Sequence, residues 1–196
     1  MSQPLTDSAL DQLFRTARSY NAYFDKPVTH EQMTAIWDVM KYGPTSANCL
    51  PARIVWCASD EAKTKLAAMA MPANGEKIMS APVTAIIGMD LEFYEQLPEL
   101  FPHADARSWF ATNDALAQTT AFRNSSLQGG YFILAARALG LDTGPMSGFA
   151  NDAVDGAFFA GSKVKSNFIC TLGYGDPASV FDRSPRPAFD RFNSVL

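Results

Sequence analysis

The chain has 196 residues, of which 47% are hydrophobic and 18% are charged, so it can bury a sizeable core and we expect a single domain over residues 1–196. A formal net charge of −4 without a basic stripe excludes nucleic acid as a partner, because neutralising phosphates needs clustered Lys and Arg. No apolar stretch approaches the roughly 20 residues of a membrane span, so no membrane partner is expected.

The N-terminal residues predict a first helix. Asp7 can cap it, and it is expected to end near Arg18 and Ser19. Residues 1–13 carry Asp7 and Asp11 and no apolar run, so they do not resemble a signal peptide.

The second predicted helix is the most clearly marked element. Thr29 and Gln32 have capping-box spacing, apolar residues then recur at helical intervals, and the Gly-Pro pair at 43–44 ends the helix. Residues 53–57 follow as a short strand, because they are rich in β-branched and aromatic side chains.

The middle of the chain predicts a helix, a loop and a buried strand. Ser59 opens the helix, and residues 72–75, which include Pro72, Asn74 and Gly75, are expected to form the loop. Residues 83–89 are nearly all apolar, which suits a strand buried on both faces. Residues 91–110 are aromatic and broken by two prolines, so we expect short helical pieces that form a cover.

The last third predicts a long helix over residues 113–139, which Gly140 ends. The paired glycines at 129–130 in its middle indicate close approach by another backbone or helix. Residues 141–145 and 168–172 are predicted strands, and residues 152–159 a short helix. The tail from 179 to 196 carries three phenylalanines and is expected to lie along a subunit surface. About four strands among helices predict an α+β domain with a small sheet covered by helices.

Several catalytic signatures are missing from the sequence. No GxGxxG follows a strand, and the segment 156–163 places its Lys after Ser, unlike a phosphate-binding loop. The two histidines, His30 and His103, are too few for a histidine metal site or a Ser-His-Asp hydrolase, and Ser147 is not in a GxSxG elbow. No metal site is therefore expected. Because the side chains offer no recognised catalytic group, we expect a bound cofactor to supply the chemistry.

Separated segments, taken in order, resemble the FMN-dependent nitroreductase family. They are Ala17-Arg-Ser-Tyr-Asn-Ala-Tyr-Phe24, Gly43-Pro-Thr-Ser-Ala-Asn-Cys-Leu-Pro51, Asn74-Gly-Glu-Lys77, Ala138-Leu-Gly-Leu-Asp-Thr-Gly-Pro-Met-Ser-Gly-Phe149 and Arg183-Ser-Pro-Arg186. The resemblance implies a three-layer fold with a small, mainly antiparallel sheet, bound FMN, and a homodimer. Two departures stand out: Tyr20 and Ala22 replace the family's Ser and second basic residue, and Leu50 replaces a Gln.

The resemblance also implies a set of cofactor-binding residues. Backbone N–H groups of Ser147 and Gly148 are implied to meet flavin N5, and no side chain is expected to act as the catalyst. The implied cofactor-binding residues are Arg18, Tyr20, Pro44, Thr45, Ser46, Asn48, Asn74, Lys77, Pro145, Met146, Ser147, Gly148, Arg183 and Arg186. In the family, the loop that 44–48 matches packs beside a flavin bound mainly by the partner subunit.

The chemistry of FMN agrees with these residue types. A phosphate favours the planar donors of Arg18 and Arg186. Reduction places negative charge near N1 and O2, which a fixed cation such as Lys77 would stabilise. Each residue alone has a simpler structural interpretation, such as a helix end, a turn or a surface charge, and only their ordered combination favours a flavin site.

Further stretches are similar to one subfamily. These are residues 41–48, 121–128, 144–149 and 173–177, and the subfamily is the malonic semialdehyde reductase group of pyrimidine degradation, whose members are named NADH dehydrogenase/NAD(P)H nitroreductase. We therefore expect ping-pong hydride transfer from NADH or NADPH to a small carbonyl acceptor such as malonic semialdehyde. The alternatives are a nitroaromatic or quinone reductase, since flavins more often pass hydride to such acceptors, and a non-catalytic flavin-binding or cofactor-free interaction protein. Three cysteines without CxxC spacing are typical of reduced thiols, so the expected location is the cytoplasm.

Overall fold

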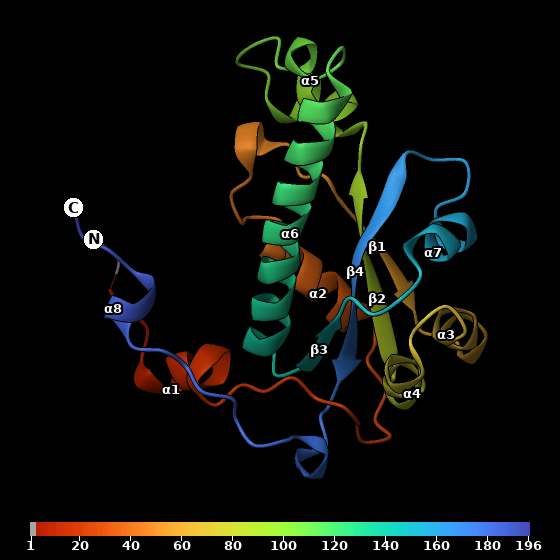
Figure 1. The fold of residues 1–196 in the computed structure, drawn as a ribbon, viewed down its shortest axis with the longest axis vertical. Helices are drawn as coiled ribbons and strands as arrows, with labels where there is room; N and C mark the ends of the chain where they lie inside the picture. Colours follow the sequence, from red (N-terminus) through yellow and green to blue (C-terminus); the bar gives the residue numbers. More distant parts are fainter. Residues whose placement is uncertain (1–2) are drawn as a thin grey trace.

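The centre of the molecule is an antiparallel sheet. A computed structural model describes residues 3–196, and within them four strands form one sheet in the order β1-β2-β4-β3 (Figure 1). The strands are β1 Ala52–Cys57, β2 Val83–Asp90, β3 Asp142–Met146 and β4 Val164–Gly173. All three strand pairings are antiparallel, which confirms the predicted α+β class and its small antiparallel sheet. The first two residues of the expected domain lie outside the described residues.

Helices cover both faces of this sheet and give three layers (Figure 1). One face packs against α2 (His30–Met40) and α6 (Asp114–Ala138), with Ala85 and Ile87 buried between them. The other face packs against α3 (Asp60–Ala67), α4 (Pro72–Ser80) and α7 (Asn151–Phe158), with Ile86 and Ile169 buried there. Consecutive residues of β2 thus enter opposite cores, as the period of a strand requires. The prediction of a strand buried on both faces is confirmed.

The segment between β2 and α6 forms the predicted cover of short helical pieces. They are the 3-10 helices Phe93–Gln96 and Arg107–Trp109, with α5 (Leu97–Leu100) between them. Phe93 and Phe110 meet edge to face with ring centroids 5.0 Å apart. Cys49 is fully buried in the same cluster, so this cover is tied to the loop that precedes β1.

The loop predicted at residues 72–75 is wrong, because α4 begins there. Pro72 stands in the first turn, where its missing N–H and fixed φ favour a helix start. Gly75 lies inside the helix, where a β-carbon would stand 3.2 Å from the carbonyl oxygen of Ala67. The glycine therefore serves the close packing of α4 on α3 and does not mark a turn.

The first helix is shorter than predicted. Thr6, and not Asp7, caps α1 (Asp7–Leu10) by accepting a hydrogen bond from Ala9 N. A short π-helical turn, Asp11–Arg15, follows and ends three residues before the predicted end near Arg18. Arg15 forms ion pairs with Asp7 and Asp11, so the charged groups of this segment pair with one another.

The two glycines inside α6 serve different needs. A β-carbon on Gly129 would stand 2.3 Å from the ring of Phe168 on β4, so close approach is confirmed for this position. The approaching group is an aromatic side chain, however, and not the backbone or helix that we expected. Gly130 faces open space, with nothing within 4 Å of its β-carbon position.

Gly129→Ala should therefore destabilise the fold. Overpacking of this kind typically costs about 1–3 kcal/mol, because the ring of Phe168 would have to leave its place against α6. The matched control is Gly156→Ala on α7, which meets nothing within 4 Å and should be neutral or stabilise by about 0.5–1 kcal/mol. Urea unfolding curves of both variants check this, and equal midpoints for the two would contradict it.

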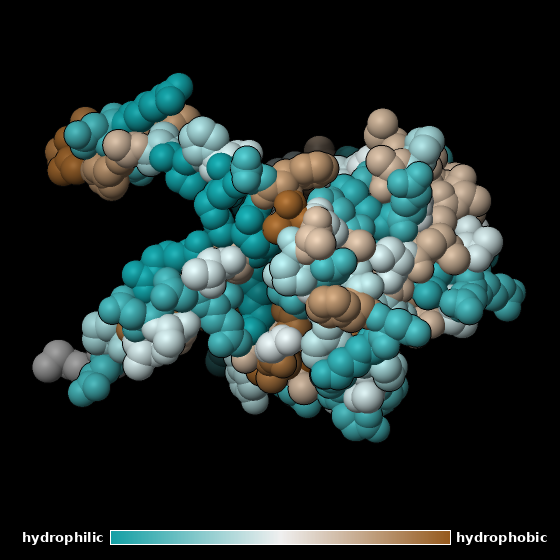
Figure 2. All heavy atoms as spheres, turned by 90° about the horizontal axis from the view of Figure 1, so that it is seen from below, coloured by the Kyte–Doolittle hydropathy of each residue, from teal (hydrophilic) through white to brown (hydrophobic). Residues whose placement is uncertain are grey.

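Both ends of the chain extend away from the three layers. The N-terminal helical segment and the C-terminal tail leave the body as two separate arms (Figure 2). The tail carries α8 (Phe189–Phe192), and its Phe181, Phe189 and Phe192 are exposed. The expected contact of the tail with a subunit surface remains a prediction. No helix in residues 3–196 is long and apolar enough to cross a bilayer.

Candidate functional site

Basic side chains from four segments line one cavity near the C-terminal end of α6. This cavity, here called the cation cavity, has a volume of ≈ 450 Å³. Its charged residues are the cations Arg18, Lys77, Arg137, Arg183 and Arg186 and the single acid Asp182. Within residues 3–196, none of the five cations forms an ion pair. Such unbalanced positive charge favours an anionic ligand, and planar guanidinium groups suit a phosphate.

Contacts between the N-terminal segment and the tail build the outer wall of the cation cavity. Arg18 donates to the carbonyl of Phe181, and Arg183 donates to the carbonyl of Ala17 at 2.8 Å. Asn21 holds the same stretch of tail through the carbonyl of Ser179, at 2.7 Å. Arg18 and Arg183 are thus brought together from opposite ends of the sequence, as the resemblance implied.

Arg137 is a member of this cavity that the sequence interpretation missed. It lies in the last turn of α6 and donates one hydrogen bond to the carbonyl of Leu13, at 3.0 Å. Its Nε is buried and has no partner among the described residues. Burial lowers the pKa of Arg137, and the nearby charge of Arg183 lowers it further. A half-buried guanidinium whose buried Nε has no acceptor suits an anionic ligand.

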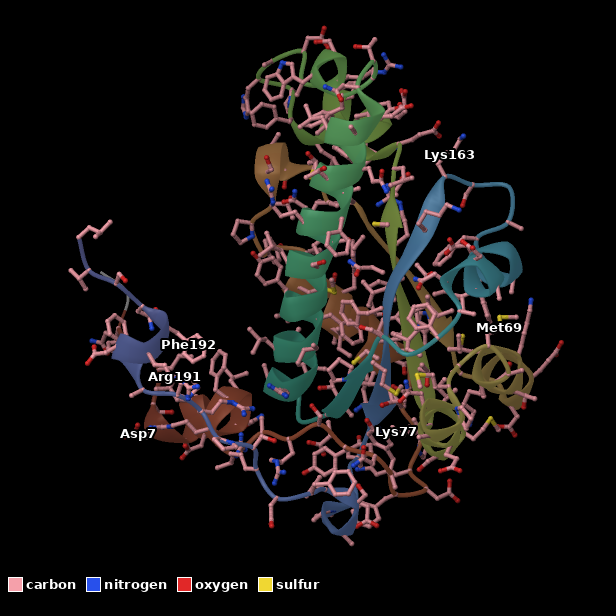
Figure 3. The ribbon with its side chains drawn as sticks, in the orientation of Figure 1. Asp7, Met69, Lys77, Lys163, Arg191 and Phe192 are labelled. Atoms are coloured by element: carbon pink, nitrogen blue, oxygen red, sulfur yellow. The ribbon has the colours of Figure 1, made fainter. Side chains whose placement is uncertain are left out.

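The backbone at Gly148 is hydrogen-bonded to α4. The same helix carries Lys77, which is labelled in Figure 3. Asn74 stands one turn before Lys77 on α4 and donates to the carbonyl of Gly148 at 3.0 Å. The carbonyl of Gly148 also accepts from Met71 N at 2.9 Å. Among the described residues, the N–H groups of Ser147 and Gly148 have no acceptor. They are therefore available to a ligand.

A side chain at position 148 would displace two neighbouring side chains. A β-carbon there would lie 2.6 Å from Nδ2 of Asn74 and 2.8 Å from Sδ of Met71. The hydrogen bond from Asn74 thus joins the backbone at 147–148 to α4, and Lys77 joins α4 to the cation cavity. Arg18 and Lys77 line the cation cavity, and Gly148 is bound to the helix that carries Lys77.

Four other candidates, Pro44, Thr45, Ser46 and Asn48, lie in the loop of residues 44–52, which packs against the cover. Three residues of this 44–52 loop, Ala47, Asn48 and Leu50, have the left-handed φ values 49°, 51° and 38°. Each non-glycine residue in such a conformation costs on the order of 1–3 kcal/mol and persists only where its surroundings hold it. Asn48 donates to the carbonyl of Leu100 in the cover at 2.8 Å, and Leu50 N donates to Oγ1 of Thr45 at 3.2 Å.

The 44–52 loop and the cation cavity lie far apart along α6. Ser46 is bound by Asn124, whereas Arg137 lines the cavity, and these two helix residues are thirteen positions apart. At a rise of 1.5 Å per residue this is a separation of about 20 Å. The structure therefore brings together Arg18, Lys77, Arg183 and Arg186, joins Asn74 and Gly148 to them, and keeps Pro44, Thr45, Ser46 and Asn48 apart from them.

Three further candidates do not line the cation cavity. The ring of Tyr20 packs against Gly175, where a β-carbon would stand 2.2 Å away, and burial raises the pKa of its hydroxyl. Met146 is buried in the core beneath α7, and Pro145 is exposed on β3. Their cofactor contacts remain predictions.

The outward face of α6 carries an apolar groove, here called the α6 groove. It is lined by Thr119, Phe122, Arg123, Ser126, Leu127, Gly130, Tyr131 and Leu134. Phe122 is 54% exposed and Leu127 is 44% exposed. An exposed apolar surface of this kind commonly marks a protein–protein contact.

Known proteins resemble this chain in sequence and in fold. Residues 14–174 match the model of the Nitroreductase family. A protein of Burkholderia lata, named as an NADH dehydrogenase/NAD(P)H nitroreductase, is 63% identical over 186 residues, which cover 95% of each chain. A protein of Polynucleobacter asymbioticus with the same name is 55% identical over 196 residues, the full length of both. A solved nitroreductase structure in complex with FMN, from Exiguobacterium sibiricum, covers both chains completely with a TM-score of 0.86 at 22% identity, which shows the shared fold.

Proposed function

The chain belongs to the nitroreductase family, and on that premise we propose that it is an FMN-dependent enzyme that passes hydride from NADH or NADPH to a small carbonyl compound such as malonic semialdehyde. The coarser activity, that of an NAD(P)H-dependent oxidoreductase of nitroreductase type, follows from the family and from the names of the relatives. The carbonyl acceptor rests on the subfamily resemblance of residues 121–128 and 144–149.

The observation that carries this proposal is the cation cavity with its neighbouring free backbone donors. Five cations face one carboxylate, and the buried Nε of Arg137 lacks a partner among the described residues. These features fit a phosphate, while the N–H groups of Ser147 and Gly148 fit a flavin ring nitrogen. Bound FMN supplies the hydride-transfer chemistry that the side chains of this chain lack.

The residues of the chain then have separate tasks. Arg18, Arg183 and Arg186 hold the phosphate in the cation cavity. Lys77 places a fixed positive charge beside the ring edge, where it stabilises the charge of the reduced state. Gly148 has no side chain that would keep the ring from its backbone, and a β-carbon there would displace the side chain of Asn74. Donor and acceptor use the same site in turn, in ping-pong order.

A second copy of the chain completes this site. Asn124, which binds Ser46, lies about 20 Å along α6 from Arg137, and Tyr131, which binds Pro44, lies about 9 Å from it. In the proposed dimer, a ligand in the cation cavity contacts the 44–52 loop of the second subunit. The exposed α6 groove and the projecting arms support such a homodimer. We propose a single FMN-binding domain per subunit, with neither nucleic acid nor membrane as a partner. The three cysteines are free and buried, which supports a reducing compartment, the cytoplasm.

The visible spectrum of the purified protein tests the proposal. It should show bound flavin, and anaerobic NADH or NADPH should bleach it. Malonic semialdehyde should then restore the absorbance faster than nitroaromatic or quinone acceptors do.

Reoxidation by nitro or quinone compounds alone would favour the second candidate, a nitroaromatic or quinone reductase, and reject the carbonyl acceptor. Bound flavin that neither nicotinamide reduces would indicate a non-catalytic flavin-binding protein. A colourless preparation that binds no added FMN would reject the flavin site itself.

A further inference from the structure

One face of α6 holds the 44–52 loop through three side chains at helical spacing. Asn124 accepts from Ser46 N at 2.8 Å, Gln128 accepts from Ala52 N at 2.8 Å, and Tyr131 donates to the carbonyl of Pro44 at 2.9 Å. Positions i, i+4 and i+7 of a helix lie on one face. The three contacts therefore act on the loop from a single side.

Asn124 and Gln128 are buried, with 2% and 0% of their surface exposed. Asn124 also donates to the carbonyl of Thr120, which fixes the orientation of its amide and presents its oxygen to Ser46. Nε2 of Gln128 is buried without a partner among the described residues. A buried amide that leaves one donor unsatisfied is unfavourable compared with an apolar residue. Its presence indicates that the position requires the acceptor that binds Ala52.

The loop needs such external support. It contains three left-handed residues and no glycine, and Asn124 and Gln128 bind its backbone at Ser46 and Ala52. Between these points the Cys49 side chain is fully buried against the cover. Without the two amides, the left-handed residues would relax toward ordinary conformations and withdraw Cys49 from the cover.

We propose that Asn124 and Gln128 are positioning residues that hold the 44–52 loop in its strained conformation and so determine how it contacts the cofactor bound by the second subunit. This inference rests on the proposed function for its second half only. That Asn124 and Gln128 fix the loop is a claim about the cofactor-free chain, and it is tested separately.

The reactivity of the Cys49 thiol reports whether the 44–52 loop keeps its conformation. Burial raises the pKa of its thiol to about 11, so it reacts slowly while the loop is closed. Cys57 and Cys170 are also fully buried, but they lie in the sheet. Asn124→Leu removes the acceptor for Ser46 at similar side-chain volume and should raise the labelling rate of Cys49 by a maleimide at least about tenfold. Cys57 and Cys170 should stay unlabelled, as peptide mass spectrometry can show.

Matched variants separate positioning from general damage. Gln128→Met should expose Cys49 in the same way, whereas Gln118→Met, the same change at an exposed position of α6, should not. Asn124→Asp keeps an oxygen acceptor for Ser46 but loses the donor to Thr120, so Cys49 should be labelled at a rate between those of the wild type and Asn124→Leu. Faster labelling of all three cysteines would mean global loosening and would overturn the inference.

The FMN dissociation constant supplies the second readout. Asn124→Leu and Gln128→Met should each raise it about tenfold, while Gln118→Met leaves it unchanged. If the wild-type protein binds no FMN, the proposed function fails and the Cys49 result still decides the hold on the loop. If the wild type binds FMN and either variant leaves Cys49 protected, or exposes it without weakening FMN binding, the positioning role is wrong.

Discussion

Arg18→Ala is expected to raise the dissociation constant of FMN on the order of 100-fold. A hydrogen bond to a charged group contributes about 1.5–3 kcal/mol, and about 1.4 kcal/mol corresponds to a factor of ten. Arg18 also donates to the carbonyl of Phe181, so its loss would release the stretch of tail that carries Arg183 and Arg186. The effect should therefore reach the upper end of that range. Titration of the cofactor-free protein with FMN, followed by flavin fluorescence, measures it.

The matched control is Arg15→Ala. Arg15 is an arginine of the same N-terminal segment, but it is already paired with Asp7 and Asp11 and does not line the cation cavity. Its removal should leave FMN affinity unchanged. Equal affinities for Arg18→Ala and the wild type would show that the phosphate lies elsewhere.

Phe122→Glu should convert the proposed dimer to a monomer and abolish FMN binding at micromolar concentration. Phe122 is more than half exposed in the α6 groove, and a charge in a buried apolar contact carries a large desolvation penalty. A monomer keeps the cation cavity but lacks the 44–52 loop of a second subunit. Light scattering at micromolar concentration reports the mass, and the flavin absorbance that co-elutes with the protein reports cofactor binding.

Met79→Glu provides the comparison for this charge. Met79 is an exposed apolar residue on α4, outside the α6 groove, so the variant should remain dimeric and yellow. A dimeric Phe122→Glu protein would place the subunit contact on another surface. A monomer that retains wild-type FMN affinity would show that one chain makes the whole site.

Much of the fold could be predicted, because its signals are local. The capping box at Thr29 and Gln32 is present as expected, and it begins α2. The apolar run at residues 83–89 predicts the strand β2, and the proline-free stretch at residues 113–139 predicts the helix α6. The prediction failed at Pro72 and Gly75, where packing of α4 on α3 outweighs the turn preference of the two residues.

The site was harder to predict, because it depends on which segments meet. Arg137 directly precedes the Ala-Leu-Gly-Leu segment, where a basic residue is ordinarily explained by the negative end of the helix dipole. Only the approach of the tail and of Leu13 to that helix end shows that Arg137 faces a cavity. The amides of Asn124 and Gln128 belong to a stretch already noted for its subfamily resemblance, yet no local pattern shows that they hold Ser46 and Ala52.

The 25-residue length of α6 has a consequence for how this protein can vary. The helix carries Asn124 and Gln128, which bind the 44–52 loop, near its middle and Arg137 at its end. Its length therefore sets the distance and the relative orientation of these two groups. Adding or deleting one residue between them would shift one group by about 1.5 Å and turn it by about 100° relative to the other. We therefore expect insertions and deletions to be better tolerated in the cover than in α6, because α6 must keep both its length and its helical phase between the two groups.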